Sequence, residues 1–335
     1  MKIIITGATG FIGRNLAERL HEDGMKVVAT GRSLTTGSEL QKKGMTFIQA
    51  DIKDLDQLNT AFSPADCVVH CAGKSGDWGK FNEFYETNVI GTNNVIKACK
   101  KNHIEKIIFI SSPSIYFTGK DRYNILESDP IPERQFYYGK TKLMAEKSLL
   151  DRAEKGPAAI ILRPRAVYGR YDNTIVPRIL QLSKKKNIPL INNGNAMVDI
   201  TYVGNLTGAV KNCLFAPDKA WNEVYNISNN DPVSVREWFG LILKIFNRPF
   251  YPKNIPEPVA IAMAGMMEVF SRLPFGNKKP SMTRFSVGYM ARSMTMCIEK
   301  AAQGLNYSPR ISNRQGFEKY KLWLETTRGH KSSYS

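Results

Sequence analysis

The sequence predicts a doubly wound parallel α/β sheet with a smaller, mostly helical carboxy-terminal lobe. Three observations support this fold class. Short runs rich in Val and Ile alternate with amphipathic stretches over the first 165 residues, and the first such run passes directly into a glycine-rich turn. After about residue 170 the alternation loosens. A chain of 335 residues is long enough to bury a large core of this kind.

The candidate strands are almost continuously apolar, as is typical of parallel strands buried on both faces. The segments between them have the spacing of amphipathic helices, and right-handed crossovers then place helices on both faces of the sheet. In chain order the strands are Ile3–Thr6, Lys26–Thr30, Thr46–Gln49, Cys67–Cys71, Lys106–Ser111 and Ala159–Arg163, with helices at Asn15–Asp23, Phe84–Lys101 and Lys142–Ala153.

The chain is expected to divide near residue 170, where Pro, Asn and Gly become more frequent. Residues 1–170 form the sheet domain, and residues 171–330 form mainly the second lobe. One later segment, Val224–Ile227, has the apolar character of a strand and is expected to return to the first sheet.

The first strand runs directly into Gly7, Gly10 and Gly13, three glycines spaced by three residues. In a Rossmann fold the first glycine permits a tight turn, the second lets the backbone approach a pyrophosphate, and the third lets the helix pack on the sheet. Phe11 and Ile12 stand in the first helical turn, where free N–H groups and the helix dipole attract phosphate. This variant of the Gly-x-Gly-x-x-Gly spacing predicts a dinucleotide site at these five residues.

The end of the second strand bears on which dinucleotide binds. An acidic residue there binds the ribose hydroxyls of NAD, whereas a basic residue accepts the 2′-phosphate of NADP. This chain has Gly31 followed by Arg32 and no carboxylate. Because Arg32 can make a charge-assisted contact to phosphate, NADP(H) is favoured, with NAD(H) as the alternative. Alternatively, Arg32 is simply an exposed arginine at the end of the strand and binds no ligand.

Tyr138 and Lys142 are four residues apart and therefore share one helix face. A phenol with a pKa of about 10 moves protons poorly at neutral pH unless a neighbouring charge stabilises its anion. We therefore expect Lys142 to lower the pKa of Tyr138. The fifth strand ends in Ser111, Ser112 and Ser114, at the sheet edge where ligands bind. One of these hydroxyls can hold a reacting oxygen against Tyr138.

Together with Asp51-Ile52, Cys71-Ala72-Gly73, Asn88 and Arg163-Pro164, these motifs resemble the extended short-chain dehydrogenase/reductase family. The chain is most similar to the branch that contains 3β-hydroxysteroid dehydrogenases and 2-alkyl-3-oxoalkanoate reductases. The resemblance spans the whole chain and is strongest through residue 170.

The resemblance implies roles for individual residues. Tyr138 would donate or accept the proton, Lys142 would bind the nicotinamide ribose, and Ser112 would orient the substrate. Asn88 would be mainly structural. Further cofactor contacts would come from Asp51, Ile52, Ala72, Gly73 and Pro164.

Two departures from the family pattern bear on the substrate. Phe117 stands where Gly usually follows the aromatic residue, and Gly31 replaces the acidic residue of NAD-dependent sugar-nucleotide members. The Met-rich stretch Val259–Phe270 can line an apolar pocket, form a buried core helix, or lie on a membrane surface with the flanking Arg272, Lys278 and Lys279.

These features predict an NADP(H)-dependent oxidoreductase that interconverts a ketone and a secondary alcohol. Its substrate would be hydrophobic, such as a β-keto acid or a steroid-like ring. The alternatives are a sugar-nucleotide epimerase or dehydratase and, in another class, a non-catalytic nucleotide-binding subunit. By analogy with the family, a homodimer is also expected.

The composition is that of an ordinary globular protein, with 42% hydrophobic and 23% charged residues. Five cysteines without paired metal-type spacing indicate a reducing, cytoplasmic setting and no bound metal. The first strand begins at residue 2, which leaves no room for a signal peptide within this sequence. The net charge of +17 is uneven, since residues 241–335 carry +10 of it. The basic residues are nevertheless dispersed and form no recognised binding module, so we expect no nucleic-acid partner, while peripheral contact with an anionic membrane stays open.

Overall fold

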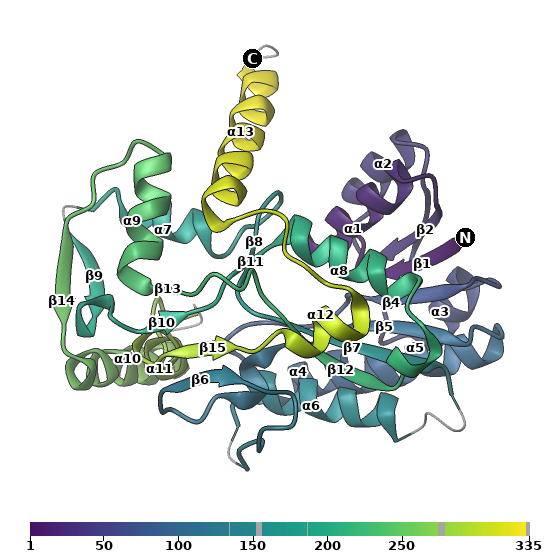
Figure 1. Ribbon diagram of the computed structural model, residues 1–335, viewed down its shortest axis with the longest axis horizontal. Helices are drawn as coiled ribbons and strands as arrows, with labels where there is room; N and C mark the ends of the chain where they lie inside the picture. Colours follow the sequence, from purple (N-terminus) through teal and green to yellow (C-terminus); the bar gives the residue numbers. More distant parts are fainter. Residues whose placement is uncertain (134, 152–155, 186, 274–278, 333–335) are drawn as a thin grey trace.

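A seven-stranded parallel sheet forms the centre of the molecule in the computed structural model (Figure 1). The structure describes residues 1–133, 135–151, 156–185, 187–273 and 279–332, with side chains through residue 327. The strand order is β12-β7-β5-β4-β1-β2-β3, which is the doubly wound arrangement predicted. The strands are β1 (Lys2–Thr6), β2 (Lys26–Gly31), β3 (Thr46–Gln49), β4 (Cys67–His70), β5 (Lys106–Ile110), β7 (Ala158–Pro164) and β12 (Glu223–Ile227).

Helices cover both faces of this sheet, as two separate hydrophobic clusters show. One face carries α1 (Phe11–Glu22), α2 (Leu34–Lys42), α8 (Val203–Leu214) and α12 (Glu299–Leu305). The other face carries α3 (Leu55–Ala61), α5 (Gly91–Lys101) and α6 (Tyr137–Leu150). Two elements from the later part of the chain, α8 and α12, therefore complete the first face of the sheet.

The stretch predicted as one helix over Phe84–Lys101 is interrupted. It consists of α4 (Phe81–Tyr85), a π-helical turn at Glu86–Ile90 and α5. The predicted helix Lys142–Ala153 is α6, which begins five residues earlier at Tyr137 and is described through Leu150. Residues 152 and 153 lie outside the described residues.

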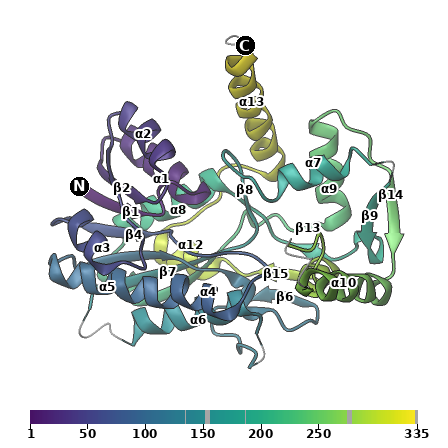
Figure 2. The same cartoon turned by 180° about the vertical axis from the view of Figure 1, so that it is seen from behind.

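The second lobe lies beside the carboxyl ends of the central strands, on the left in Figure 1 and on the right in Figure 2. It contains helices and small sheets of very short strands. Its helices are α7 (Val176–Leu182), α9 (Val235–Ile245), α10 (Glu257–Arg272), α11 (Arg284–Ala291) and α13 (Asn313–Ser332), the last of which projects away from the body in both views. Its strands are β6 (Arg122–Ile125), β8 (Val167–Tyr168), β9 (Ile188–Ile191), β10 (Met197–Val198), β11 (Thr201–Tyr202), β13 (Val233–Ser234), β14 (Pro252–Ile255) and β15 (Met294–Met296).

The Met-rich segment forms α10, which turns its small residues inward. Ala260 and Ala264 are fully buried, whereas Met266, Val269 and Phe270 are 57%, 61% and 67% exposed. The flanking Lys278 lies outside the described residues. Within the described part of the chain, none of the helices has the length and apolarity needed to cross a bilayer.

Candidate active site

The glycine turn between β1 and α1 is tight because backbone lies where side chains would be. Gly7 has φ +69°, and a Cβ on it would lie 2.7 Å from the backbone of Ala72. A Cβ on Gly13 would lie 2.3 Å from the carbonyl oxygen of Gly7. The Gly10 N–H donates to that same oxygen at 2.9 Å. Side chains are therefore excluded from the turn, as a pyrophosphate cradle requires.

The first turn of α1 presents unpaired backbone donors to this cradle. Gly10 is the N-cap and supplies no side-chain acceptor to the N–H groups of Phe11, Ile12 and Gly13. Orphan N–H groups at a helix amino terminus, together with the helix dipole, bind anions. The described residues at this turn thus fit the diphosphate of a dinucleotide.

The carboxyl ends of β2 and β3 bring Arg32 and Asp51 together. The Arg32 side chain is 75% exposed, and its Nη1 lies 3.8 Å from Asp51 Oδ2. A Cβ on Gly31 would lie 2.4 Å from Thr9 Oγ1, so Thr9 occupies the place that a side chain on Gly31 would need. Ile52 is buried and packs against Gly91, where a Cβ would lie 2.6 Å from Ile52 Cδ1.

Ala72 and Gly73 follow β4 at the same edge and are held in place by Asn88. The Asn88 Oδ1 accepts the Lys74 N–H at 2.7 Å, and Asn88 Nδ2 donates to the Lys74 carbonyl and to Thr141 Oγ1, each at 3.0 Å. Asn88 therefore ties the loop after β4 to α6. A Cβ on Gly73 would be 3.1 Å from Asn88 Oδ1 and 4.0 Å from Lys142 Nζ, so this loop lies beside Lys142.

Close packing of α6 on the segment after β5 brings Tyr138 to Ser112. A Cβ on Gly139 would lie 2.9 Å from the Ser114 carbonyl oxygen, so only glycine allows this approach. Ser112 is close enough to the Tyr138 phenol to lower its pKa. Ser112 also accepts the Ser114 N–H at 3.2 Å and donates to Ser114 Oγ at 3.0 Å. A phenol and a serine hydroxyl held together in this way can bind one substrate oxygen.

The structure contradicts the expectation that Lys142 lowers the pKa of Tyr138. Burial raises the pKa of Tyr138 to about 12, with Ser112 acting in the opposite direction. Lys142 is itself buried, and burial lowers its pKa to about 7. Its Nζ donates to the Ile110 carbonyl at 2.6 Å and lies 3.8 Å from the centroid of the Phe109 ring. Lys142 is not among the groups that shift the pKa of Tyr138, and its ammonium is hydrogen-bonded to the backbone instead.

A buried ionic network, which the sequence reasoning missed, lies beneath these residues. Arg163 donates from Nε to Glu146 Oε1 at 3.0 Å and from Nη2 to Glu146 Oε2 at 2.5 Å. Ser111 also donates to Glu146, and Arg163 donates to the Tyr116 hydroxyl. Glu146 lies one turn after Lys142 on α6 and favours the charged form of Lys142. The sequence offered one sign of this network, because Glu146 lies four residues after Lys142 and therefore on the same face of the helix. Pro164, which follows Arg163, is buried at the end of β7.

An aromatic cluster lies against the Tyr138 segment. Its members are Phe117, Phe136, Phe285 and Tyr289, with ring centroids 4.4 to 6.0 Å apart. Phe136 comes two residues before Tyr138, and the Tyr289 phenol contributes to raising the pKa of Tyr138. Phe117, at the position where the family usually has Gly, contacts Phe136 and both α11 rings, and Phe136 also contacts Phe285 directly. The cluster offers an apolar surface next to the paired hydroxyls.

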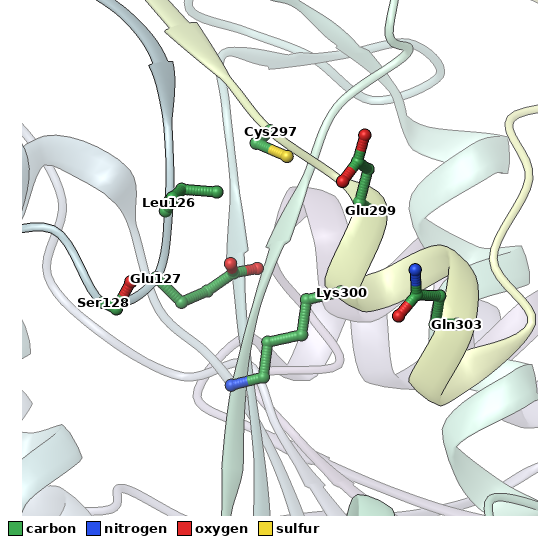
Figure 3. Close-up of a pocket in the computed structure, with 7 residues that line it drawn as sticks. All are labelled: Leu126, Glu127, Ser128, Cys297, Glu299, Lys300 and Gln303. Atoms are coloured by element: carbon green, nitrogen blue, oxygen red, sulfur yellow. The ribbon is translucent and has the colours of Figure 1, made fainter.

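A surface pocket of about 300 Å³ lies elsewhere, between the end of β6 and α12 (Figure 3). One of its carboxylates and its amine are engaged in the fold, since Glu127 accepts the Asn226 N–H at 2.7 Å and Lys300 pairs with Glu223 at 2.7 Å. It contains none of the residues described above, and we assign it no role in chemistry. Its lining residues are Leu126, Glu127, Ser128, Cys297, Glu299, Lys300 and Gln303.

A dinucleotide cradle and a Ser, Tyr and Lys set at the carboxyl edge of one parallel sheet define an enzyme of the short-chain dehydrogenase/reductase class. Comparison with known proteins agrees. Residues 3–228 match the model of the NAD dependent epimerase/dehydratase family, and the chain belongs to that family.

Several relatives span nearly the full chain. The chain is 32% identical to a 2-alkyl-3-oxoalkanoate reductase of Shewanella oneidensis, covering 96% of this chain and 85% of that protein. It is 31% identical to a 2-alkyl-3-oxoalkanoate reductase of Stenotrophomonas maltophilia, covering 96% and 98%. Among solved structures, the UDP-glucuronic acid 4-epimerase of Bacillus cereus in complex with NAD is 25% identical, with a TM-score of 0.75 and coverage of 98% and 99%. The sequence relatives are oxidoreductases of the branch predicted.

Proposed function

We propose that this enzyme is an NADP(H)-dependent reductase that interconverts a ketone and a secondary alcohol on a hydrophobic 3-oxo acid. The observation that carries this proposal is the pairing of Ser112 with the buried Tyr138 phenol beside the aromatic cluster of Phe117, Phe136, Phe285 and Tyr289. Full-length similarity to two reductases named for 2-alkyl-3-oxoalkanoates supports the substrate class.

The residues have distinct roles in this proposal. The bound cofactor supplies the hydride chemistry. With its pKa raised to about 12, Tyr138 carries its proton at neutral pH and can donate it to a carbonyl oxygen that becomes an alkoxide. Ser112 donates a hydrogen bond to the same oxygen, and after the proton transfer it donates a hydrogen bond to the Tyr138 phenolate. Lys142, with a pKa lowered to about 7, can bind the cofactor ribose or return a proton.

The preference for NADP(H) rests on the ends of β1 and β2. Arg32 is mostly exposed, and its ion pair with Asp51, at 3.8 Å, is long and solvent-exposed, so the side chain can turn towards a phosphate at little cost. Thr9 excludes from Gly31 the carboxylate that would bind the ribose of NAD. Thermal shift with NADPH and NADH on the wild type and Arg32→Ala tests this. We expect a larger shift with NADPH that the variant loses. Equal shifts in the wild type would contradict the NADP(H) assignment.

Activity is tested by following NADPH consumption with a 2-alkyl-3-oxoalkanoate and with a steroid-like 3-ketone. A panel of UDP-sugars and dTDP-sugars, followed without added reductant, tests the epimerase or dehydratase alternative. Turnover of a nucleotide sugar alone would replace our proposal with that alternative. Binding of NADPH without turnover of any compound would favour the non-catalytic subunit.

Two expectations about partners stay predictions. Peripheral membrane contact through the exposed face of α10 predicts co-sedimentation with anionic vesicles, weakened in a Met266→Lys, Phe270→Lys double variant. Homodimer formation predicts twice the monomer mass by light scattering.

A further inference from the structure

Arg165 is a buried guanidinium that lacks hydrogen-bond partners within the described part of the chain. Its side chain is 2% exposed, and its Nε and Nη1 are closed off without an acceptor. A buried arginine is ordinarily paired, because an uncompensated charge in a protein interior is strongly unfavourable. Such a group is suited to binding an anion.

Arg163, two residues earlier on β7, shows the contrast. Alternate residues on a strand share a face, and Arg163 satisfies its guanidinium with Glu146 and Tyr116. Arg165 lies at the carboxyl end of the strand, past Pro164, where ligands bind to parallel sheets. One arginine of this segment therefore completes the fold, whereas two donors of the other have no acceptor among the described residues.

Arg165 also adjoins the reacting residues. Its Cζ lies 3.9 Å from the centroid of the Tyr289 ring. Tyr289 is the aromatic residue whose phenol acts on Tyr138, and it belongs to the aromatic cluster. Arg165 is therefore separated from Tyr138 by a single aromatic residue, Tyr289.

Asp199 is an acidic residue whose pKa the charge of Arg165 affects. Burial raises the pKa of Asp199, and Arg165 counteracts this at a distance. Among the described residues no ion pair within 4.0 Å joins the two; Asp199 Oδ2 accepts the Met296 N–H at 2.7 Å, and Asp199 Oδ1 is buried without a hydrogen-bond partner. Asp199 lessens the cost of burying the charge but leaves the guanidinium donors unused.

We propose that Arg165 binds the carboxylate of the substrate, while the aromatic cluster of Phe117, Phe136, Phe285 and Tyr289 receives its alkyl chain. This inference rests on the proposed function and deepens it, because it selects 3-oxo acids over neutral ketones and steroid-like rings. A guanidinium matches a carboxylate with two parallel hydrogen bonds, which fixes orientation as well as charge. The Ser112–Tyr138 pair would then meet the neighbouring oxo group.

The test compares an acid with its ester. A 2-alkyl-3-hydroxyalkanoate and its methyl ester are oxidised with NADP⁺ by the wild type, Arg165→Met and Arg165→Lys, with the exposed Arg19→Met as matched control. We expect kcat/KM for the acid to fall about 100-fold in Arg165→Met, mainly through KM, and to recover partly in Arg165→Lys. Activity on the ester should stay unchanged.

Two results would overturn the proposal: an equal fall for acid and ester, or no fall at all. A structural role would also lower the thermal midpoint of Arg165→Met, which we expect to stay within about 3 °C of the wild type. If the wild type oxidises neither compound, the proposed function fails, and binding still tests Arg165. Calorimetry of the NADP⁺-loaded enzyme with decanoate and decanol should then show a preference for decanoate that Arg165→Met abolishes. Equal affinities would contradict the assignment.

Discussion

Replacing Lys142 with Met should change how the free energy of unfolding depends on pH. Lys142 is buried on the Phe109 ring, and burial lowers its pKa from 10.5 to about 7. Between these values the unfolded chain binds a proton that the folded protein does not. Stability contributed by this residue therefore rises as pH increases through the window and is lost as pH falls towards 7.

The change in unfolding free energy due to Lys142 must be separated from the contributions of other groups that titrate in or near this pH range. One proton changes the free energy of unfolding by about 1.4 kcal/mol per pH unit. Burial raises the pKa of Cys71 and Cys99 from 9.0 to about 12, so these thiols lower stability as pH rises past the unfolded value. His70, lowered from 6.5 to about 3, acts only at lower pH. From about pH 7 to 8.5 Lys142 therefore dominates and contributes about 2 kcal/mol.

The measurement is chemical denaturation of the wild type and Lys142→Met at several pH values across this window. We expect the wild type to gain about 2 kcal/mol relative to the variant between pH 7 and 8.5. Lys147→Met, an exposed lysine on the same helix, serves as control and should follow the wild type. Parallel curves for wild type and Lys142→Met would refute the burial argument.

Other variants test separate parts of the site. Tyr138→Phe should lower kcat at least about 1,000-fold while the NADPH dissociation constant changes less than about threefold. Near-normal turnover in this variant would show that Tyr138 is not the proton donor. Gly13→Ala forces a Cβ to within 2.3 Å of the Gly7 carbonyl and should cost about 2 kcal/mol and most cofactor affinity by thermal shift. Gly208→Ala, with open space around it on α8, should instead stabilise by about 0.5–1 kcal/mol. Phe117→Ala should raise KM for long-chain ketones more than for short ones, and equal changes would contradict the aromatic pocket.

The central sheet was predictable because its signals are local. Buried parallel strands read as short apolar runs, and the glycine turn after β1 appears within a few residues. The helix predicted over Phe84–Lys101 is present, but the sequence did not predict its π-helical turn, which brings Asn88 to Lys74 and Thr141. A partnership between residues so far apart leaves no periodic signal. Similarly, strands of two to four residues in the second lobe, such as β10 and β15, are too short to show alternation.

The candidate site was found through residue types and spacing, but its electrostatics were not. Spacing placed Lys142 on the face of Tyr138, yet it could not show that Ile110 and Phe109 would surround the amine and weaken its charge. Likewise, nothing in the sequence distinguished Arg165, which follows the Arg163-Pro164 motif, as a candidate binding residue. Its significance depends on which distant side chains, such as Tyr289 and Asp199, come near it without pairing with it.

The contact between Thr9 and Gly31 restricts how cofactor preference could change by mutation. An acidic side chain at residue 31 would place its Cβ 2.4 Å from Thr9 Oγ1 and 2.9 Å from Thr9 Cγ2. Gly31→Asp alone is therefore expected to disrupt the first βαβ unit before it can recruit NAD. With Thr9→Gly introduced first, the same substitution becomes sterically acceptable. The route from one dinucleotide to the other is thus ordered, and a laboratory selection that samples single substitutions at residue 31 would miss it.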